Sequence, residues 1–337
     1  MKAVPNPIFG PNRFKLGLFN ANCDGGFAIS KAPERWRANW DDIVKISLMA
    51  DEAGIEFILP VAKWRGLGGE ADNLGCSFET LTHSAAIGAL TKRIAMFVTI
   101  DAERRYDQGL EWFRILEKLL KGGAPFDWDG EFYKLRGLTT NPLPLQKPMP
   151  PVMSAGFSHQ GRDFAAQASD LLFTSVSSLD RAPMIVKSVS DYAARYGRTI
   201  PVYTSSHIVC RPTRQEAEDF YHYFAEEMAD RASLDHMRRQ KAATMGKDTP
   251  KEERIDLNPQ AHTRLRGKIY PGTFPGSYTF VGSPDDIVDE MVQLEAAGLR
   301  GAAITFLDYI ADMPYFLQEV LPRMERAGLR EKLPAQV

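Results

Sequence analysis

The sequence predicts an α/β protein of the (β/α)8 TIM-barrel type. Two observations lead to this fold class. From Arg13 onward, short apolar segments alternate with amphipathic ones, which is the pattern of a parallel sheet covered by helices. The chain has 337 residues, of which 44% are hydrophobic and 25% charged, so its length suits one such barrel and its composition is globular. We therefore expect residues 1–337 to form a single barrel domain.

Seven short apolar segments, several of them rich in β-branched residues, are predicted to be the barrel strands. In chain order they are Phe14–Phe19, Ile55–Val61, Arg93–Ile100, Pro151–Ala155, Asp170–Thr174, Pro201–Val209 and Gly301–Leu307.

The helices between these strands have recognisable ends. Asp41 or Asp42 is expected to cap the first helix, and Gly54 to stop it. Thr213 and Glu216 have the spacing of a capping box. The run Ser283-Pro284-Asp285-Asp286 combines a cap, a proline at the first helical position and two acids. Two helices in the second half of the chain are therefore expected to begin at Arg214 and Pro284.

A strongly amphipathic helix is expected from about Glu103 to Lys121, with a buried stripe of Trp112, Ile115/Leu116 and Leu119. Phe126–Leu138 is expected to form a hairpin around Asp129-Gly130. Residues of about 225–280 are polar and charged, and we expect a long, partly helical insertion there.

Composition excludes several function classes. The formal charge of −2 gives no reason to bind nucleic acid or an anionic membrane. Three cysteines without CxxC spacing favour a reducing, cytoplasmic setting over a disulfide framework. Six scattered histidines lack the spacing of a metal site, and the GxSxG pattern of a serine hydrolase is absent. No metal, nucleic-acid partner or membrane span is expected.

In a parallel barrel, function collects at the carboxyl ends of the strands. Three loops there are candidates: Asn20–Phe27, Leu59–Gly69 with Lys63, and Ser154–Arg162, whose helix start could bind phosphate. A solvated turn, a surface lysine and a plain strand-to-helix turn are the structural alternatives. His207 is interpreted as a satisfied core histidine, and Cys23 as a small buried side chain.

Five separated motifs then add a family resemblance that spans nearly the whole chain. They are LPVAKWRGLGG, ERRYDQGLEWFRILEKLL, DGEFY, PPVMSAGFSHQG and VGSPDDIV. Together they resemble the luciferase-like, flavin-dependent monooxygenases, in particular the branch that oxidises pyrimidines and dimethylsulfone. The resemblance implies a barrel that binds FMN.

The resemblance also implies roles for single residues. Ala62 with Lys63, and Arg105 with Tyr106, match flavin-contacting pairs. Ser158 matches a phosphate-contacting serine, and Gly156 and Phe157 would contribute backbone to the same turn. Thr99 matches a threonine beside the oxygen-reactive edge of the flavin. Lys63 and Thr99 are thus the catalytic candidates.

The chain departs from the family pattern after the third strand. Relatives continue there through a helix and a fourth strand, whereas this chain passes from Thr99-Ile100 directly to Asp101–Tyr106. One βα unit, on the order of 30 residues, is therefore expected to be missing. In an alternative view, Glu103–Lys121 is the ordinary third helix and Phe126–Leu138 supplies a strand. A shortened barrel leaves an open edge, which favours a homodimer or higher homo-oligomer.

The function implied is that of a reduced-FMN-dependent monooxygenase. A separate flavin reductase would supply the reduced FMN, and O2 would oxygenate a small heteroatom-containing or heterocyclic substrate. Two alternatives remain open: hydride transfer with the deazaflavin F420, and a shortened relative that binds flavin without turnover.

Overall fold

The computed structural model describes residues 6–63, 65–98, 106–144, 146–147, 149–156, 158–244, 264–265, 268–269 and 277–333. Its centre is a curled parallel sheet whose continuous path is β3-β2-β1-β12-β8-β7-β6. The bounds of these strands are β1 (Lys15–Phe19), β2 (Phe57–Leu59), β3 (Ala95–Met96), β6 (Met153–Ala155), β7 (Leu171–Thr174), β8 (Val202–Cys210) and β12 (Leu299–Thr305).

These seven strands are the seven that the sequence predicted, in the order of a (β/α) barrel. All the pairings along the path are parallel, for example Leu18 with Ile58 and with Ile304. The path ends at β3 and at β6, and no pairing within the described residues joins these two strands. The sheet is therefore a partial barrel, open at the place where the sequence lacks a βα unit.

One strand was not predicted. β11 (Tyr278–Gly282) lies at the end of the expected insertion and pairs in parallel with Ser206–Cys210 of β8. Its residues alternate between aromatic and β-branched side chains and are fully buried, which is typical of a strand. The insertion of about 225–280 therefore ends before Tyr278. Its other described residues include the helix α7 (Arg231–Thr244) and the short pair β9 (Arg264–Leu265) and β10 (Lys268–Ile269).

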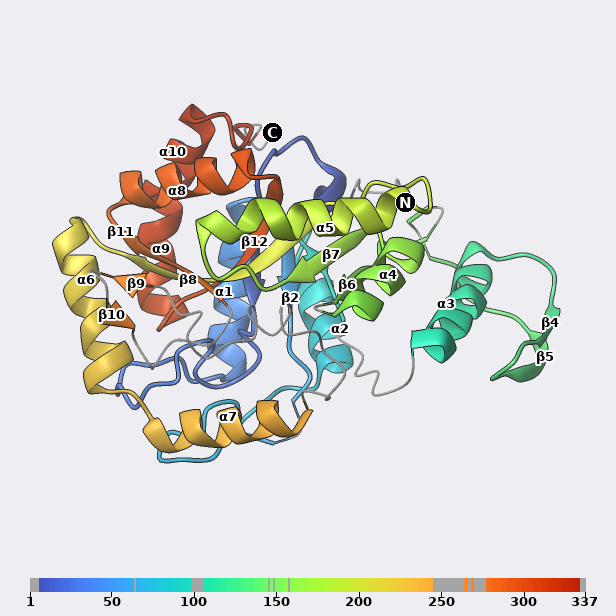
Figure 1. The fold of residues 1–337 in the computed structure, drawn as a ribbon, viewed down its shortest axis with the longest axis horizontal. Coiled ribbons are helices and arrows are strands. Elements are labelled where there is room, and N and C mark those ends of the chain that lie inside the picture. The colour runs from blue at the N-terminus through green and yellow to red at the C-terminus, as the bar shows by residue number, and fades with distance from the viewer. Residues whose placement is uncertain are drawn as a thin grey trace.

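Helices cover the outer face of the sheet (Figure 1). They are α1 (Trp40–Glu52), α2 (Thr80–Leu90), α4 (His159–Ala168), α5 (Ala182–Ala194), α8 (Pro284–Ala296), α9 (Tyr309–Glu319) and α10 (Leu321–Arg326), while α6 (Arg214–His222) follows β8 and runs into the π-helical turn η3 (Tyr223–Glu227).

Two apolar layers result from the alternation of side chains along the strands. Leu16, Leu18 and Ile304 face outward and pack against the helices. Phe19, Phe57, Phe97, Phe173 and Tyr203 face the other way and fill the barrel interior. The barrel interior is therefore mainly aromatic.

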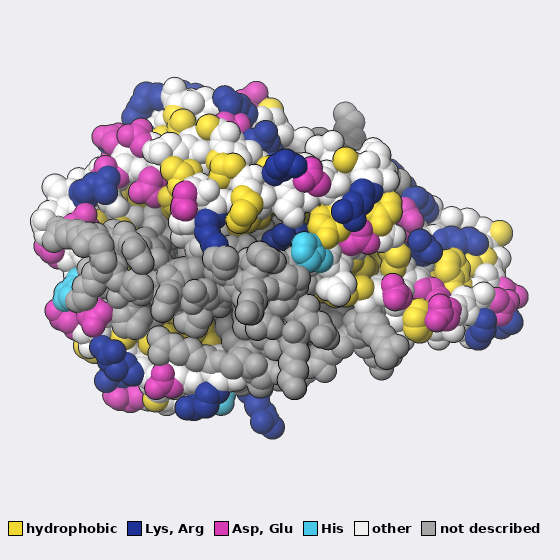
Figure 2. Space-filling view, viewed as in Figure 1, with side chains coloured by type: hydrophobic (Ala, Val, Ile, Leu, Met, Phe, Trp, Pro, Cys, Tyr) yellow, Lys and Arg dark blue, Asp and Glu magenta, His cyan; other side chains and the backbone are white. Residues whose placement is uncertain are grey.

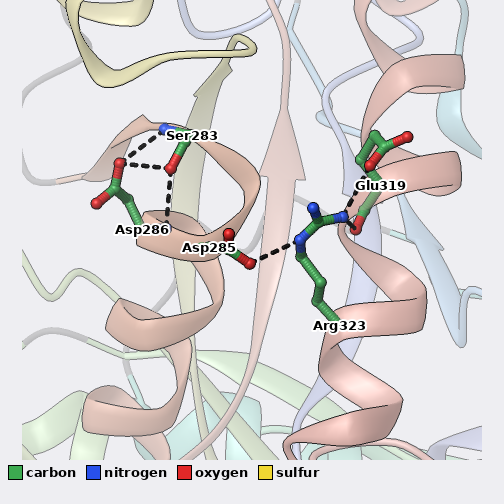
Figure 3. A network of polar contacts seen from close by, with 5 residues as sticks. All are labelled: Ser283, Asp285, Asp286, Glu319 and Arg323. Carbon is green, nitrogen blue, oxygen red and sulfur yellow. Dashed lines mark hydrogen bonds and ion pairs between the residues drawn. The ribbon is translucent and has the colours of Figure 1, made fainter.

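Both predicted helix starts are present, and each has the geometry of a capping box. Thr213 and Glu216 cap α6 reciprocally. Ser283 Oγ accepts from the Asp286 N–H, while the Asp286 carboxylate accepts from the backbone N–H and hydroxyl of Ser283 (Figure 3). The first helix differs from the prediction, because Asn39 rather than Asp41 or Asp42 is its cap, and its side chain accepts from the Asp42 N–H. Gly54 follows that helix with a φ of 73°, as predicted.

The helix α3 (Tyr106–Lys121) and the hairpin of β4 (Phe126–Asp129) and β5 (Lys134–Leu138) form an arm. Figure 1 places α3 beyond α4, on the side away from the sheet, with the hairpin farther out. Glu111 joins helix and hairpin by accepting from Trp128 Nε1 and from the N–H groups of Phe132 and Tyr133. The hairpin prediction is confirmed, so the alternative barrel strand at 126–138 is wrong.

The predicted buried stripe of α3 is correct only in part. Ile115 is buried, but Trp112 is 41% exposed, and Leu116 and Leu119 are half-buried. The reason is that α3 packs mainly against α4 and is joined to its own hairpin through Glu111. Figure 2 shows hydrophobic side chains open to view on this arm.

Candidate functional site

The loop after β2 carries Ala62 and Lys63, and a buried asparagine from the loop after β1 holds it in place. Asn22 Nδ2 donates to the carbonyl oxygens of Val61 and Phe78 at 3.0 and 2.9 Å, and its Oδ1 accepts from the Val61 N–H at 2.9 Å. Asn22 is fully buried, so water does not compete for these bonds. Ala62 and Lys63 are half-buried next to this anchor.

Cys23 lies at the same anchor, and its thiol contacts the Val61 carbonyl and Ser77 Oγ. Burial raises the pKa of the thiol to about 11, although the positive charge of Lys63 opposes that shift. The thiol is therefore neutral at physiological pH and a poor nucleophile. This confirms the interpretation of Cys23 as a small buried side chain. The effect on the pKa also shows that the Lys63 ammonium lies close enough to the loop after β1 to interact with it electrostatically.

A second element of the site is the turn from β6 into α4. Ser158 is the N-cap of α4, and its Oγ accepts from the Gly161 N–H at 3.1 Å. A Cβ atom on Gly156 would lie 2.6 Å from the Gly161 carbonyl oxygen, so only glycine allows the strand end to approach the helix this closely. The turn thus presents a hydroxyl and the positive end of a helix, which together suit an anion.

Tyr106 joins this turn from the start of α3. Its phenol oxygen lies 3.3 Å from Ser158 Oγ, and its ring packs at 6.0 Å from that of Phe164 in α4. The structure therefore brings together three residues that the sequence singled out, Tyr106, Gly156 and Ser158. Ala62 and Lys63 lie at the end of β2, on the other side of the sheet opening. Thr99, Arg105 and Phe157 lie outside the described residues.

Sequence reasoning missed a row of polar side chains across β11, β8 and β12. His207 pairs in register with Thr279 on one side and with Thr305 on the other. Its Nδ1 lies 2.9 Å from Thr305 Oγ1, whereas His207 Nε2 and Thr279 Oγ1 have no hydrogen-bond partner. The interpretation of His207 as a satisfied core histidine thus holds for one ring nitrogen only.

Two signals could have pointed to this row. Alternation along 201–209 places His207 on the same face as Tyr203, and Tyr203 lies in the barrel interior. His207 and Thr305 also lie at the carboxyl ends of their strands, where barrel sites form. Burial lowers the pKa of His207 to about 3, so the imidazole is neutral at physiological pH.

Within the described ranges, no group of three or more His, Cys, Asp or Glu side chains is placed to hold a metal ion. Among the helices of the described part, none combines the length and apolar character needed to cross a membrane.

Comparisons with known proteins agree with this geometry. The family model for luciferase-like monooxygenases matches residues 95–301. Pyrimidine monooxygenase RutA of Bradyrhizobium sp. (strain BTAi1 / ATCC BAA-1182) is 26% identical over 379 residues, covering 95% of this chain and 99% of the relative. The FMNH2-dependent dimethylsulfone monooxygenase of Pseudomonas putida is 22% identical over 358 residues, 91% of this chain and 94% of the relative. Both alignments are longer than the 337-residue chain, so both relatives contain residues without a counterpart here.

Solved structures give the same fold. DmoA from Hyphomicrobium sulfonivorans superposes with a TM-score of 0.78 at 14% identity, over 94% of this chain and 89% of that one. Long-chain alkane monooxygenase LadA superposes with a TM-score of 0.75 at 15% identity, over 96% of this chain and 94% of that one.

Proposed function

Because the chain belongs to the luciferase-like monooxygenase family, we propose that it oxygenates a small organic substrate with O2 and reduced FMN. Membership makes the chain an oxidoreductase of the flavin-dependent monooxygenase class. The proposal adds the reduced state of the FMN, its supply by a separate flavin reductase, and a heteroatom-containing or heterocyclic substrate. The named relatives act on pyrimidines and on dimethylsulfone, which supports that substrate class.

The observation that carries the proposal is the turn formed by Gly156, Ser158 and the first turn of α4, with Tyr106 beside it. These residues fit the phosphate of FMN, because hydroxyl groups and helix N-termini are the groups that bind phosphate in proteins. We assign Arg105 and Phe157 to the same turn on the basis of the family motif.

The isoalloxazine ring would then lie across the carboxyl ends of the strands, with Ala62 and Lys63 at the end of β2. Reduced FMN, when bound, supplies the electrons that activate O2. Lys63 and Thr99 are proposed to hold and donate protons where negative charge develops on oxygen. The aromatic barrel interior of Phe19, Phe57 and Phe97 would exclude water from that place.

We further propose that the chain works as a homodimer or higher homo-oligomer in the cytoplasm. The sheet ends openly at β3 and β6, and α3, which lies beyond α4, leaves Trp112 exposed on the arm. A second copy would cover these apolar groups. The three cysteines are free thiols, which suits a reducing compartment.

The deciding experiment compares FMN with riboflavin, which lacks the phosphate. Both are reduced and titrated anaerobically into the wild-type protein and into Ser158→Ala. Ser283→Ala is the matched control, because it removes an N-cap serine from a distant helix. We expect the wild type to bind FMN more tightly than riboflavin. In Ser158→Ala, but not in Ser283→Ala, this affinity ratio should fall about tenfold, which is the contribution of one charge-assisted hydrogen bond.

Mixing the reduced complex with oxygen then tests turnover. Oxygen consumption coupled to an oxygenated product supports the monooxygenase. Tight flavin binding without any product would point instead to a non-catalytic relative, and dye reduction with F420 but not FMN to the deazaflavin alternative. If the wild type and Ser158→Ala bind FMN with equal affinity, Ser158 does not bind the phosphate of FMN.

A further inference from the structure

The row of His207, Thr279 and Thr305 is a hydrogen-bonding surface inside the protein. Residues paired in register on neighbouring parallel strands have side chains on the same face of the sheet, so all three point the same way. That face is the barrel interior, because Tyr203, four residues before His207 in β8, and Ala303, two residues before Thr305 in β12, lie on it. His207, Thr279 and Thr305 are at most 3% exposed.

We assign the tautomer of His207 from the two polar contacts of Thr305. The Thr305 hydroxyl donates to the Ser206 carbonyl oxygen at 3.2 Å, so its single proton is used. With its proton donated to that carbonyl, the Thr305 oxygen accepts from His207 Nδ1–H across the 2.9 Å contact, and we assign this tautomer to the ring. Burial lowers the pKa of His207 to about 3, and the ring carries only this one proton. Nε2 is consequently a lone-pair acceptor.

Thr279 offers the complementary group. Its hydroxyl has no hydrogen-bond partner, so its proton is available to an acceptor. An unpartnered acceptor on β8 thus lies beside an unpartnered donor on β11, in a part of the protein that water does not reach. Buried polar groups without partners are rare and unfavourable, and they persist where a ligand satisfies them.

We propose that His207 and Thr279 together bind the edge of a cyclic amide or imide. The ligand N–H would donate to His207 Nε2, and the adjacent carbonyl oxygen would accept from the Thr279 hydroxyl. A carboxylate does not fit, because it has no proton for Nε2 and would be buried without a countercharge. The proposal rests on the proposed function and extends it by naming the chemistry that the interior recognises.

Two molecules in the proposed reaction carry such an edge. One is a substrate with a nitrogen heterocycle, and the other is the pyrimidine ring of the flavin itself. N-methylation removes the donor from either ligand and leaves its carbonyl groups in place. Uracil paired with 1,3-dimethyluracil therefore tests the substrate, and FMN paired with 3-methyl-FMN tests the flavin.

The variant that tests the pair is Thr279→Val, which keeps the shape of the side chain and removes the unpartnered hydroxyl. Thr204→Val is the control, since it makes the same change on the opposite face of β8, where Thr204 Oγ1 accepts from the Val176 N–H. We expect Thr279→Val to keep or raise the unfolding temperature and Thr204→Val to lower it. A purely structural role for Thr279 would give no change in ligand binding.

Equilibrium binding is measured on the full chain, for FMN and 3-methyl-FMN alone and for both uracils with reduced FMN bound under anaerobic conditions. The wild type should bind the N–H form of one ligand pair at least tenfold more tightly than the methylated form. Thr279→Val should weaken the binding of that N–H form about tenfold, the value of one hydrogen bond, while Thr204→Val should not. The pair that responds identifies the substrate or the flavin as the ligand.

Two outcomes overturn the inference. If FMN binds but neither ligand pair is discriminated, or if Thr279→Val binds both N–H forms as the wild type does, the row recognises no amide edge and the proposed function survives. If the wild type binds neither FMN nor 3-methyl-FMN in either redox state, the proposed function fails and the inference fails with it.

Discussion

The phenol oxygen of Tyr106 lies 3.3 Å from the hydroxyl oxygen of Ser158, although the two residues are 52 positions apart in the sequence. This contact ties the start of α3 to the start of α4 and gives the candidate phosphate turn a second hydroxyl. It is also a point where the projecting arm meets the barrel.

Removing the phenol oxygen should weaken flavin binding without affecting folding. Tyr106 is 45% exposed, so Tyr106→Phe should change the free energy of unfolding by less than about 0.5 kcal/mol. The affinity for reduced FMN should fall about three- to tenfold, because one hydrogen bond at the turn is lost. Anaerobic titration with denaturation in urea measures both. An unchanged FMN affinity would place Tyr106 outside the site.

Gly156→Ala should damage the same turn by sterics. The new Cβ would lie 2.6 Å from the Gly161 carbonyl oxygen, and the strand end and the helix would have to separate. We expect at least a tenfold loss of FMN affinity and a destabilisation of about 1–3 kcal/mol. Gly88→Ala is the control, because its Cβ would meet only Met96 at 3.6 Å in a helix that favours alanine. Wild-type FMN binding by Gly156→Ala would contradict the assignment.

The buried ion pair of Glu56 and Arg330 should contribute strongly to the free energy of unfolding. Glu56 accepts from the Leu16 N–H and from Arg330, and both members of the pair are 2% exposed. Arg330→Met leaves the Glu56 charge buried without its partner and should cost about 3–5 kcal/mol. Arg13→Met removes a pair whose arginine is 61% exposed and should cost at most about 1 kcal/mol. Urea denaturation of both variants measures the difference in the free energy of unfolding. Equal losses in the two variants would show that the buried pair contributes no more than the exposed one.

Two histidines should make the protein sensitive to mild acid. Burial lowers the pKa of His83 from 6.5 to about 4 and that of His207 to about 3. As pH falls below 6.5, the unfolded chain therefore binds protons that the folded chain excludes. Each histidine should remove up to about 1.4 kcal/mol of stability per pH unit, until the pH reaches its folded pKa.

The variant His83→Leu tests the direction of this pH dependence of stability. Neither ring nitrogen of His83 has a hydrogen-bond partner, so the substitution should cost little at pH 8. The loss of stability between pH 6.5 and 4.5 should become about half as steep, as measured by urea denaturation across that range. A slope equal to that of the wild type would show that His83 is not buried in its neutral form.

Trp112→Glu should weaken self-association if a second copy covers the arm. Trp112 is 41% exposed, and its neighbours on the same helix face are the uncharged Leu116 and Leu119. A charge at position 112 therefore opposes burial of this face. Sedimentation equilibrium should show a shift toward the monomer of at least tenfold in Kd. Met184→Glu on α5 is the control, at 57% exposure. A wild-type protein that is monomeric at high micromolar concentration would contradict the oligomer.

Local patterns in the chain predicted seven of the eight described strands of the central sheet, all except β11. Local hydrophobic periods, capping residues and the motifs between Leu59 and Val288 suffice for this, because each depends on neighbours close in the chain. The missing βα unit was also predictable, and the structure leaves the sheet open between β3 and β6.

Features that depend on contacts between distant parts of the chain could not be predicted in this way. Trp112 has the spacing of a buried residue, but α3 packs against α4 in the arm and leaves Trp112 exposed. The His207 interpretation failed for a related reason. Whether Nε2 finds a partner depends on Thr279 and Thr305, which lie 72 and 98 positions away in the chain and meet His207 only when β8, β11 and β12 pair.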